Sequence, residues 1–142
     1  MNIGIDIGRV IIGGNGEDTF FTDMFFDTPE VENAYGSMLN LKNAGHEIHL
    51  VSKCGTSVED KSIKWLNLWG YFYIVPSHRA HFVRKRHLKA PMAQALELDI
   101  FIDDRQDIID SMEGIVEHRI LFTSWEQTNK ELQEIFDKAS KG

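Results

Sequence analysis

Short apolar runs alternate along this chain with longer segments in which apolar residues recur every three or four positions. The runs have the length of buried strands, and the periodic segments have the spacing of helices with one buried face. Strands are therefore predicted at residues 3–5, 47–53, 80–83, 99–102 and 118–122. Helices are predicted from about residue 28 to 44, 57 to 69, 89 to 98, 105 to 113 and 125 to 139.

The ends of the predicted helices carry recognisable signals. Thr28, Pro29 and Glu30 offer a capping hydroxyl, a proline and an acid in the order typical of a helix start. Gly45 follows the last periodic residue of that segment and is expected to end the helix. Trp65 and Trp69 lie on one face of the next helix, and both are expected in the core.

Strands that alternate with helices in this rhythm indicate βαβ units. The predicted fold is α/β, a three-layer Rossmann-like parallel sheet with helices on both faces. All of residues 1–142 are assigned to one domain, because this length suits a single hydrophobic core. The sequence between the predicted strands is too short for a full cap domain.

Composition narrows the functional classes. The net charge of −7 argues against general nucleic-acid binding. No apolar run approaches the roughly 20 residues that span a membrane, and the first residues lack the pattern of a secretion signal. The single cysteine, Cys54, cannot form an internal disulfide, which fits a reducing compartment. A cytoplasmic location is therefore expected.

Polar residues follow the predicted strands at the places where these end. Asp6 follows the first strand, Ser52 closes the second, and Asp103 with Asp104 follows the fourth. In a parallel α/β sheet these carboxyl ends lie at one edge, where ligands bind. Clustered carboxylates favour a hard divalent cation such as Mg²⁺. Lys89 could then hold a phosphate group against the metal while the Asp6 carboxylate attacks phosphorus.

Four motifs in this order resemble those of the haloacid dehalogenase-like (HAD-like) superfamily, mostly Mg²⁺-dependent phosphatases with a Rossmann-like core. "IGIDIGRVII" resembles the first motif, "IHLVSK" the second, "HLKAPMAQAL" the third and "DIFIDDRQD" the fourth. The resemblance covers residues 1 to about 122. It implies that Asp6 is the nucleophile, that Ser52 and Lys89 are catalytic and bind phosphate, and that the metal ligands are Asp6, the Gly8 carbonyl, Asp103 and Asp104.

Gly8 departs from the family pattern. Where the chain has Gly8, the common form has an aspartate that protonates the leaving group and later activates water. Its absence removes help that is typically worth about 10²–10⁴-fold in rate. The backbone carbonyl remains, so metal binding is expected to survive. Arg9, which is unusual beside it, is expected either to meet the phosphate or to obstruct the pocket.

Basic residues crowd the segment "HRAHFVRKRHLK", which has five Lys or Arg and three His in twelve positions. Either it is a rim that recruits anions, or it is a solvated loop. The substrate-binding residues are predicted to be Arg9, Ser52, Lys53, Arg84 and Lys89.

Residues 13–27 have aromatic pairs without helical spacing and are predicted to form a flap. Phe20, Phe21, Phe25 and Phe26 could cover the site or form a homodimer contact.

Two functional hypotheses follow. The first is a Mg²⁺-dependent phosphatase-type hydrolase that acts on a phosphorylated small molecule or macromolecule through an aspartyl-phosphate on Asp6. The second is a catalytically weak or inactive HAD-like protein that binds metal and a phosphorylated ligand or a protein partner.

Overall fold

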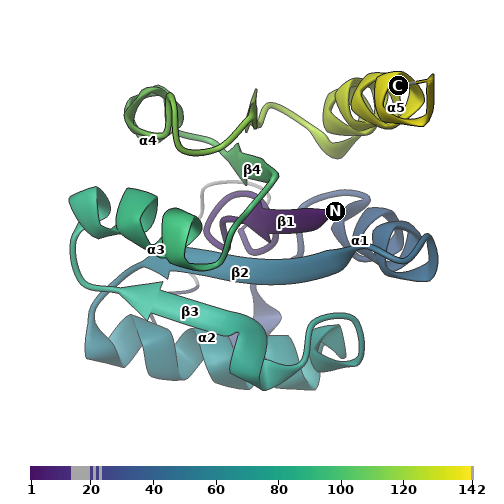
Figure 1. The fold of residues 1–142 in the computed structure, drawn as a ribbon. Coiled ribbons are helices and arrows are strands. Elements are labelled where there is room, and N and C mark those ends of the chain that lie inside the picture. The colour runs from purple at the N-terminus through teal and green to yellow at the C-terminus, as the bar shows by residue number, and fades with distance from the viewer. Residues whose placement is uncertain (14–19, 21, 23, 142) are drawn as a thin grey trace.

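A five-stranded parallel sheet with helices on both faces forms the framework of the chain (Figure 1). A computed structural model describes residues 1–13, 20, 22 and 24–141. The strands are β1 (Asn2–Ile5), β2 (Glu47–Lys53), β3 (Ala80–Val83), β4 (Ile100–Asp103) and β5 (His118–Leu121). The α-helices are α1 (Ala34–Asn43), α2 (Thr56–Leu68), α3 (Lys89–Ala95), α4 (Gln106–Ser111) and α5 (Trp125–Lys141). The predicted α/β Rossmann-like fold class is confirmed.

Strand order determines which residues meet at the edge of the sheet. The order is β3-β2-β1-β4-β5, so β1 lies in the centre and pairs with β2 on one side and β4 on the other. Ile5 of β1 is in register with Leu50 and Ile102. The residues that follow these three strands therefore emerge side by side, as the sequence predicted.

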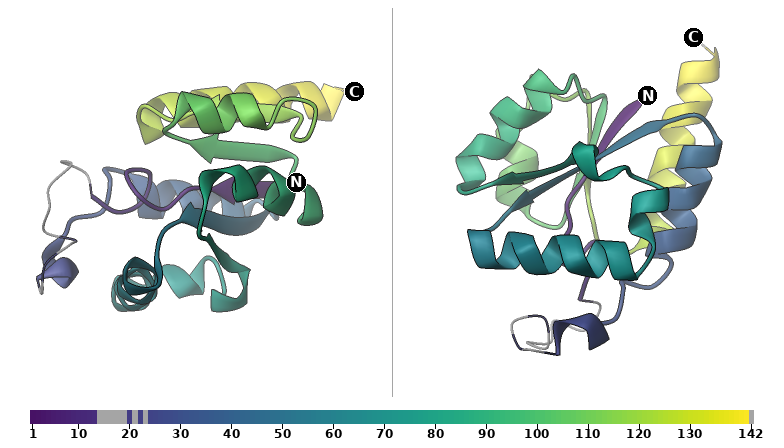
Figure 2. Two further views of the ribbon diagram at one scale, coloured as in Figure 1. Left: turned by 90° about the vertical axis from the view of Figure 1, so that its left-hand side faces the viewer. Right: turned by 90° about the horizontal axis from the view of Figure 1, so that it is seen from below.

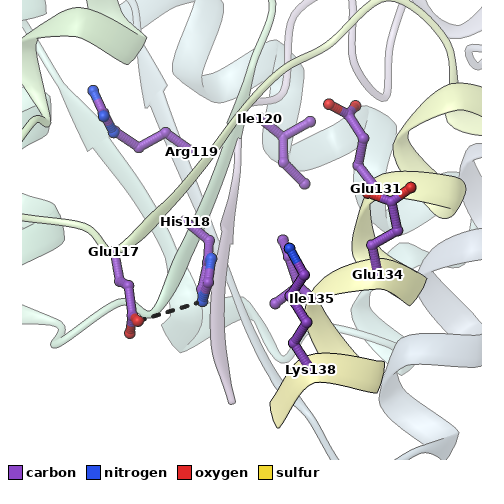
Figure 3. Close-up of a pocket in the computed structure, with 8 residues that line it drawn as sticks. All are labelled: Glu117, His118, Arg119, Ile120, Glu131, Glu134, Ile135 and Lys138. Atoms are coloured by element: carbon purple, nitrogen blue, oxygen red, sulfur yellow. Dashed lines mark ion pairs between the residues drawn. The ribbon is translucent and has the colours of Figure 1, made fainter.

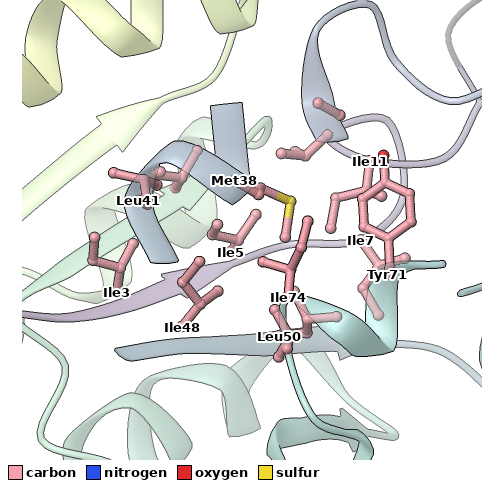
Figure 4. Close-up of a cluster of buried hydrophobic side chains, with 14 of the residues drawn as sticks. Ile3, Ile5, Ile7, Ile11, Met38, Leu41, Ile48, Leu50, Tyr71 and Ile74 are labelled. Carbon is pink, nitrogen blue, oxygen red and sulfur yellow. The ribbon is translucent and has the colours of Figure 1, made fainter. Parts of the chain in front are cut away.

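Two hydrophobic clusters cover the two faces of the sheet. The larger contains Ile3 and Ile5 of β1 with buried residues of α1, α2 and α5. Figure 4 shows Ile3 and Ile5 beside Met38 and Leu41 of α1. The smaller contains Val51 and Phe101 with residues of α3 and α4. The two views in Figure 2 show α3 and α4 on one side of the sheet and α1 and α5 on the other. No helix within the described ranges is long and apolar enough to cross a membrane.

The start of α1 differs from the prediction. Thr28 is fully buried and does not cap a helix; its backbone carbonyl accepts a hydrogen bond from Trp65 Nε1 at 2.9 Å. The next residues stay extended because Val31 N–H donates to the Ile11 carbonyl at 2.7 Å and Glu30 bridges Ile12. The helix begins only at Ala34, after Asn33 has taken a left-handed conformation.

Much of the predicted flap lies outside the described residues, namely 14–19, 21 and 23. Phe20 is buried and meets Phe25 edge to face, with ring centroids 6.3 Å apart. Phe26 is 40% exposed, and its carbonyl accepts a hydrogen bond from Trp69 Nε1. The flap therefore packs on the end of α2 in its described part, and a homodimer through it stays a prediction. Trp69, expected in the core, is 36% exposed.

Trp125, the first residue of α5, fixes the loop that follows β1. Its side chain is fully buried, and Nε1 donates a hydrogen bond to the Val10 carbonyl at 2.8 Å. A buried carbonyl that loses its partner carries a desolvation penalty of about 1–3 kcal/mol. Replacing Trp125 with Phe should therefore lower the free energy of unfolding by at least this amount, as measured by urea denaturation.

Trp69→Phe is the matched control, because the Phe26 carbonyl that it would release lies in an exposed contact and can bond to water. Trp69→Phe should lower the free energy of unfolding clearly less than Trp125→Phe does. Equal losses for the two variants would show that the buried contact to Val10 is not what stabilises the loop.

Candidate functional site

The carboxyl ends of the central strands surround a cavity of about 670 Å³. Asp6 follows β1, Ser52 and Lys53 close β2, Asp104 follows β4, and Lys89 opens α3. Most of the residues predicted for the site therefore come together. The cavity is lined by Asp6, Gly8, Arg9, Ser52, Lys53, Arg86, Lys89, Asp104, Arg105, Gln106 and Asp107.

A buried ion-pair network lies at the base of this cavity. Lys89 Nζ donates to Asp6 Oδ1 at 3.1 Å and to Asp103 Oδ2 at 2.7 Å. The side chains of Lys89 and Asp103 are 3% and 0% exposed, so the network is almost cut off from water. The backbone N–H of Arg105 donates to the other Asp103 oxygen at 3.0 Å. Asp103 is thus held at both oxygens, whereas Asp6 also faces the cavity.

Burial controls the protonation of these groups. It raises the pKa of Asp6 to about 8, because a charged carboxylate is poorly solvated there; Lys89 opposes this shift and Asp103 adds to it. Burial likewise raises the pKa of Asp103, against the attraction of Lys89. Burial alone would lower the pKa of Lys89, but the two carboxylates outweigh it and raise that pKa. The ammonium group therefore stays charged.

The carboxylates fit a divalent cation. Asp6, Asp103 and Asp104 each offer an oxygen, and these oxygens lie within 4.8 Å of one another. Lys89 contributes one positive charge to three carboxyl groups, which leaves negative charge uncompensated when all three are ionised. Oxygen-only ligands that converge in this way suit Mg²⁺ or another hard cation. The same residues were predicted as metal ligands from the sequence.

The loop after β1 brings Gly8 and Arg9 to the cavity. The Ile7 carbonyl accepts N–H groups from Ile11 at 2.9 Å and Ile12 at 3.1 Å, and Arg9 N–H donates to the Ile12 carbonyl at 2.8 Å. This tight turn places Arg9 in the left-handed region, at φ 65°. A Cβ atom added at Gly8 would meet no heavy atom within 4 Å. The missing side chain has therefore left open space.

Some basic residues of the segment 78–89 line the cavity, and others lie elsewhere on the surface. Arg84 was predicted to bind substrate, but it is not among the residues that line the cavity. It instead donates to Glu59 Oε1 at 2.8 Å and to the Cys54 carbonyl at 3.2 Å. Arg86 lies on the cavity wall in its place. Arg86 begins a 3₁₀ helix (Arg86–Leu88) that reverses the chain after β3, whereas Arg84 points toward α2.

Three cavity residues at the end of the fourth motif, Arg105, Gln106 and Asp107, are not among the site residues predicted from the sequence. Arg105 bonds to Asp107 through Nε at 3.1 Å, and Gln106 Nε2 donates to Asp110 at 2.8 Å. Their signal in the sequence is their place directly after Asp103 and Asp104 at a strand end. The hydrogen bond from Arg105 lowers the pKa of Asp107.

A second cleft, of about 340 Å³, lies between β5 and α5 (Figure 3). It is lined partly by His118 and Arg119 of β5 and by Glu131, Glu134 and Lys138 of α5. His118 Nε2 lies 3.8 Å from Glu117, as Figure 3 shows. These side chains mix both charges without converging on one point, so the first cavity remains the candidate active site.

Replacing Lys89 with Met would leave Asp6 and Asp103 buried without their cation. Breaking such a pair typically costs about 3–5 kcal/mol. The raised pKa values mean that the two carboxyl groups keep their protons to a higher pH in the folded state than in the unfolded state. The loss of unfolding free energy should therefore be large at about pH 8, where the groups ionise, and smaller at about pH 5, where they are neutral. Urea unfolding in metal-free buffer at both pH values measures this difference.

Lys85→Met serves as the control, because Lys85 is an exposed lysine of the same segment outside the cavity. It should change the free energy of unfolding little at either pH. A loss for Lys89→Met that is the same at both pH values would mean that packing, and not charge, explains the effect.

Comparison with known proteins gives distant relatives. No protein-family model matches the chain. A protein of Oceanobacillus iheyensis with the name "putative nucleotidase" is 27% identical over 96 residues, which span 68% of this chain and 50% of that protein. The chain thus spans half the length of this relative.

Solved structures share the fold at low sequence identity. The class C acid phosphatase of Bacillus anthracis superposes with a TM-score of 0.59 at 15% identity, covering 87% of this chain and 66% of the phosphatase. A chain of the Pnkp1/Rnl/Hen1 RNA repair complex gives a TM-score of 0.61 at 13% identity, covering 86% of this chain and 42% of that one. These likenesses establish the fold.

Proposed function

We propose that the protein is a Mg²⁺-dependent phosphatase-type hydrolase that cleaves a phosphomonoester, with Asp6 as the nucleophile. One observation carries this proposal: the Asp6 carboxylate lies at a cavity with the Ser52 hydroxyl and the Lys89 ammonium, beside the carboxyl groups of Asp103 and Asp104. A carboxylate nucleophile, anion-binding groups and a place for a divalent cation are what phosphoryl transfer requires.

The metal would be held by Asp6, Asp103 and Asp104, with the Gly8 carbonyl as a further oxygen. When bound, Mg²⁺ would reduce the repulsion between the Asp6 carboxylate and the phosphate. Two of the three proteins compared above have names that denote enzymes that release phosphate, a "putative nucleotidase" and an acid phosphatase, and this supports the reaction class.

The chain's own residues would act in two steps. The Ser52 hydroxyl would donate a hydrogen bond to a phosphate oxygen, and the Lys89 ammonium would offset the negative charge of the phosphate. These contacts would orient the phosphorus toward Asp6. An Asp6 oxygen would form a bond to phosphorus as the bond between phosphorus and the ester oxygen breaks. The ester oxygen would take a proton from water and leave as the alcohol. Water would then attack the phosphorus, releasing inorganic phosphate and the free Asp6 carboxylate.

Gly8 supports a second candidate function. With no side chain there, the described cavity lacks an acid at the position that the resemblance assigns to the proton donor. A protein that binds metal and a phosphorylated ligand without efficient turnover would have the same cavity. The two candidates differ in whether phosphate is released catalytically.

Asp6→Asn should abolish phosphate release from p-nitrophenyl phosphate, because an amide oxygen cannot serve as the attacking nucleophile. The wild-type rate should depend on Mg²⁺ and should disappear with a chelator. Steady-state release of p-nitrophenol measures both effects, with Asp110→Asn, which alters an exposed carboxylate outside the cavity, as the matched control.

The same assay distinguishes the two candidates. Turnover by the wild type favours the hydrolase, and a burst of one equivalent without further turnover would place the defect in hydrolysis of the phosphorylated enzyme. Identical background rates for wild type and Asp6→Asn would rule out the hydrolase and leave the binding protein.

Gly8→Asp should increase turnover. The open space at this position accepts a Cβ atom without a clash, and Gly8 does not adopt a left-handed conformation. An acid placed there could protonate the leaving oxygen and then activate water, a gain of about 10²–10⁴-fold in related chemistry. We expect kcat to rise by at least the lower end of this range for an alkyl phosphate, whose leaving group needs a proton.

Gly8→Asn is the control for size and polarity without an acid, and it should leave the rate near that of the wild type. A thermal unfolding curve for each variant tests whether the fold is kept. Equal rates for the Asp and Asn variants would show that proton donation at position 8 does not limit this enzyme.

A further inference from the structure

Two arginines of the cavity differ from the other arginines of the chain. The sequence has six arginines, and all six lie within the described residues. Three of them pair with carboxylates: Arg79 with Glu47, Arg84 with Glu59, and Arg105 with Asp107. Arg119 donates to the Ile109 carbonyl.

The guanidinium groups of Arg9 and Arg86 make no hydrogen bond or ion pair with the described part of the chain, and both residues line the cavity. In a protein with a net charge of −7, carboxylate partners are plentiful. Two guanidinium groups left without one on the wall of a single cavity indicate that an anion from outside the chain is their partner.

Lys53 adds a third cation to the same wall. It is the last residue of β2, its side chain is exposed, and within the described residues it has no carboxylate partner. We name Arg9, Lys53 and Arg86 the cationic rim. Lys89 is not part of it, because its ammonium lies buried at the base of the cavity between Asp6 and Asp103.

The backbone at Arg9 is strained. A residue with a Cβ atom at φ 65° costs roughly 1–2 kcal/mol that glycine would avoid. The turn is held by the hydrogen bond from Arg9 N–H to the Ile12 carbonyl and by the bridge between Gly8 and Ile12. Strain of this kind often marks a functional site, and here it carries a long cationic side chain to the cavity.

The cavity exceeds the needs of one phosphate group. Its volume of about 670 Å³ lies in the range of pockets that hold whole small molecules. The phosphate next to Asp6 has Ser52, Lys89 and the metal as its partners under the proposed function. The cationic rim is therefore available to bind another part of the ligand.

We propose that the cationic rim binds a second phosphate, so that the ligand of this cavity is a small molecule with two phosphate groups. One phosphate lies at Asp6 and the other contacts Arg9, Lys53 and Arg86. The hydrolysis of the first phosphate rests on the proposed function, whereas the binding of the second does not.

Binding to the Asp6→Asn variant tests this without turnover. Isothermal titration calorimetry with Mg²⁺ would compare fructose 6-phosphate with fructose 1,6-bisphosphate, and adenosine 5′-monophosphate with adenosine 3′,5′-bisphosphate. Charge-assisted bonds to the second phosphate should make at least one bisphosphate bind roughly tenfold or more tightly than its monophosphate.

Changing Arg9 and Arg86 to Gln in the same protein should reduce this preference to about threefold or less, while the monophosphate loses little affinity. Lys85→Gln is the control, since it removes a neighbouring exposed cation outside the cavity. It should keep the preference.

Three outcomes would overturn the inference. The first is equal affinity for the bisphosphates and their monophosphates, and the second is a preference that survives in the double variant. The third is tighter binding of a 5′-phosphorylated oligonucleotide than of either bisphosphate, which would make the rim a site for a polymer. Hydrolysis assays on the wild type keep the two proposals apart. Tight binding of a bisphosphate without any release of phosphate would refute only the proposed hydrolase. Release of phosphate without tighter binding of a bisphosphate would refute only the proposed role of the cationic rim.

Discussion

A buried ammonium group between two carboxyl groups is the interaction on which this site depends. Lys89 lies between Asp6 and Asp103, where water is nearly excluded and isolated charges would be strongly unfavourable. It holds carboxyl groups from two strands close enough to share a ligand. Because Asp103 is held at both oxygens and Asp6 is held by Lys89 at one, the network leaves one Asp6 oxygen free to react.

The strand order makes this network possible. With β1 central, the residues after β1, β2 and β4 emerge together, and the start of α3 reaches across them. Trp125, far away in the sequence, secures the loop after β1 through the Val10 carbonyl. The positions of Gly8 and Arg9 thus depend on a helix that does not line the cavity.

Residues at the ends of buried strands could be located from the sequence, because apolar runs that stop at Asp6, Ser52 and Asp103 mark the strand ends directly. The start of α1 could not. Its local signals at Thr28 are overridden by pairing with the loop after β1, a contact distant in sequence. The sequence also could not show which of Arg84 and Arg86 lines the cavity, because the turn between them determines which side chain reaches it.

The open space at Gly8 has an evolutionary consequence. Codons for glycine and aspartate can differ by one base, and a Cβ atom at this position meets no neighbour that would have to move. A Gly8 codon of GGT or GGC is therefore one point mutation from an aspartate at this position, and the new Cβ atom would not be blocked. A lineage could gain or lose that acid repeatedly while the strands, the buried lysine and the cavity stay unchanged.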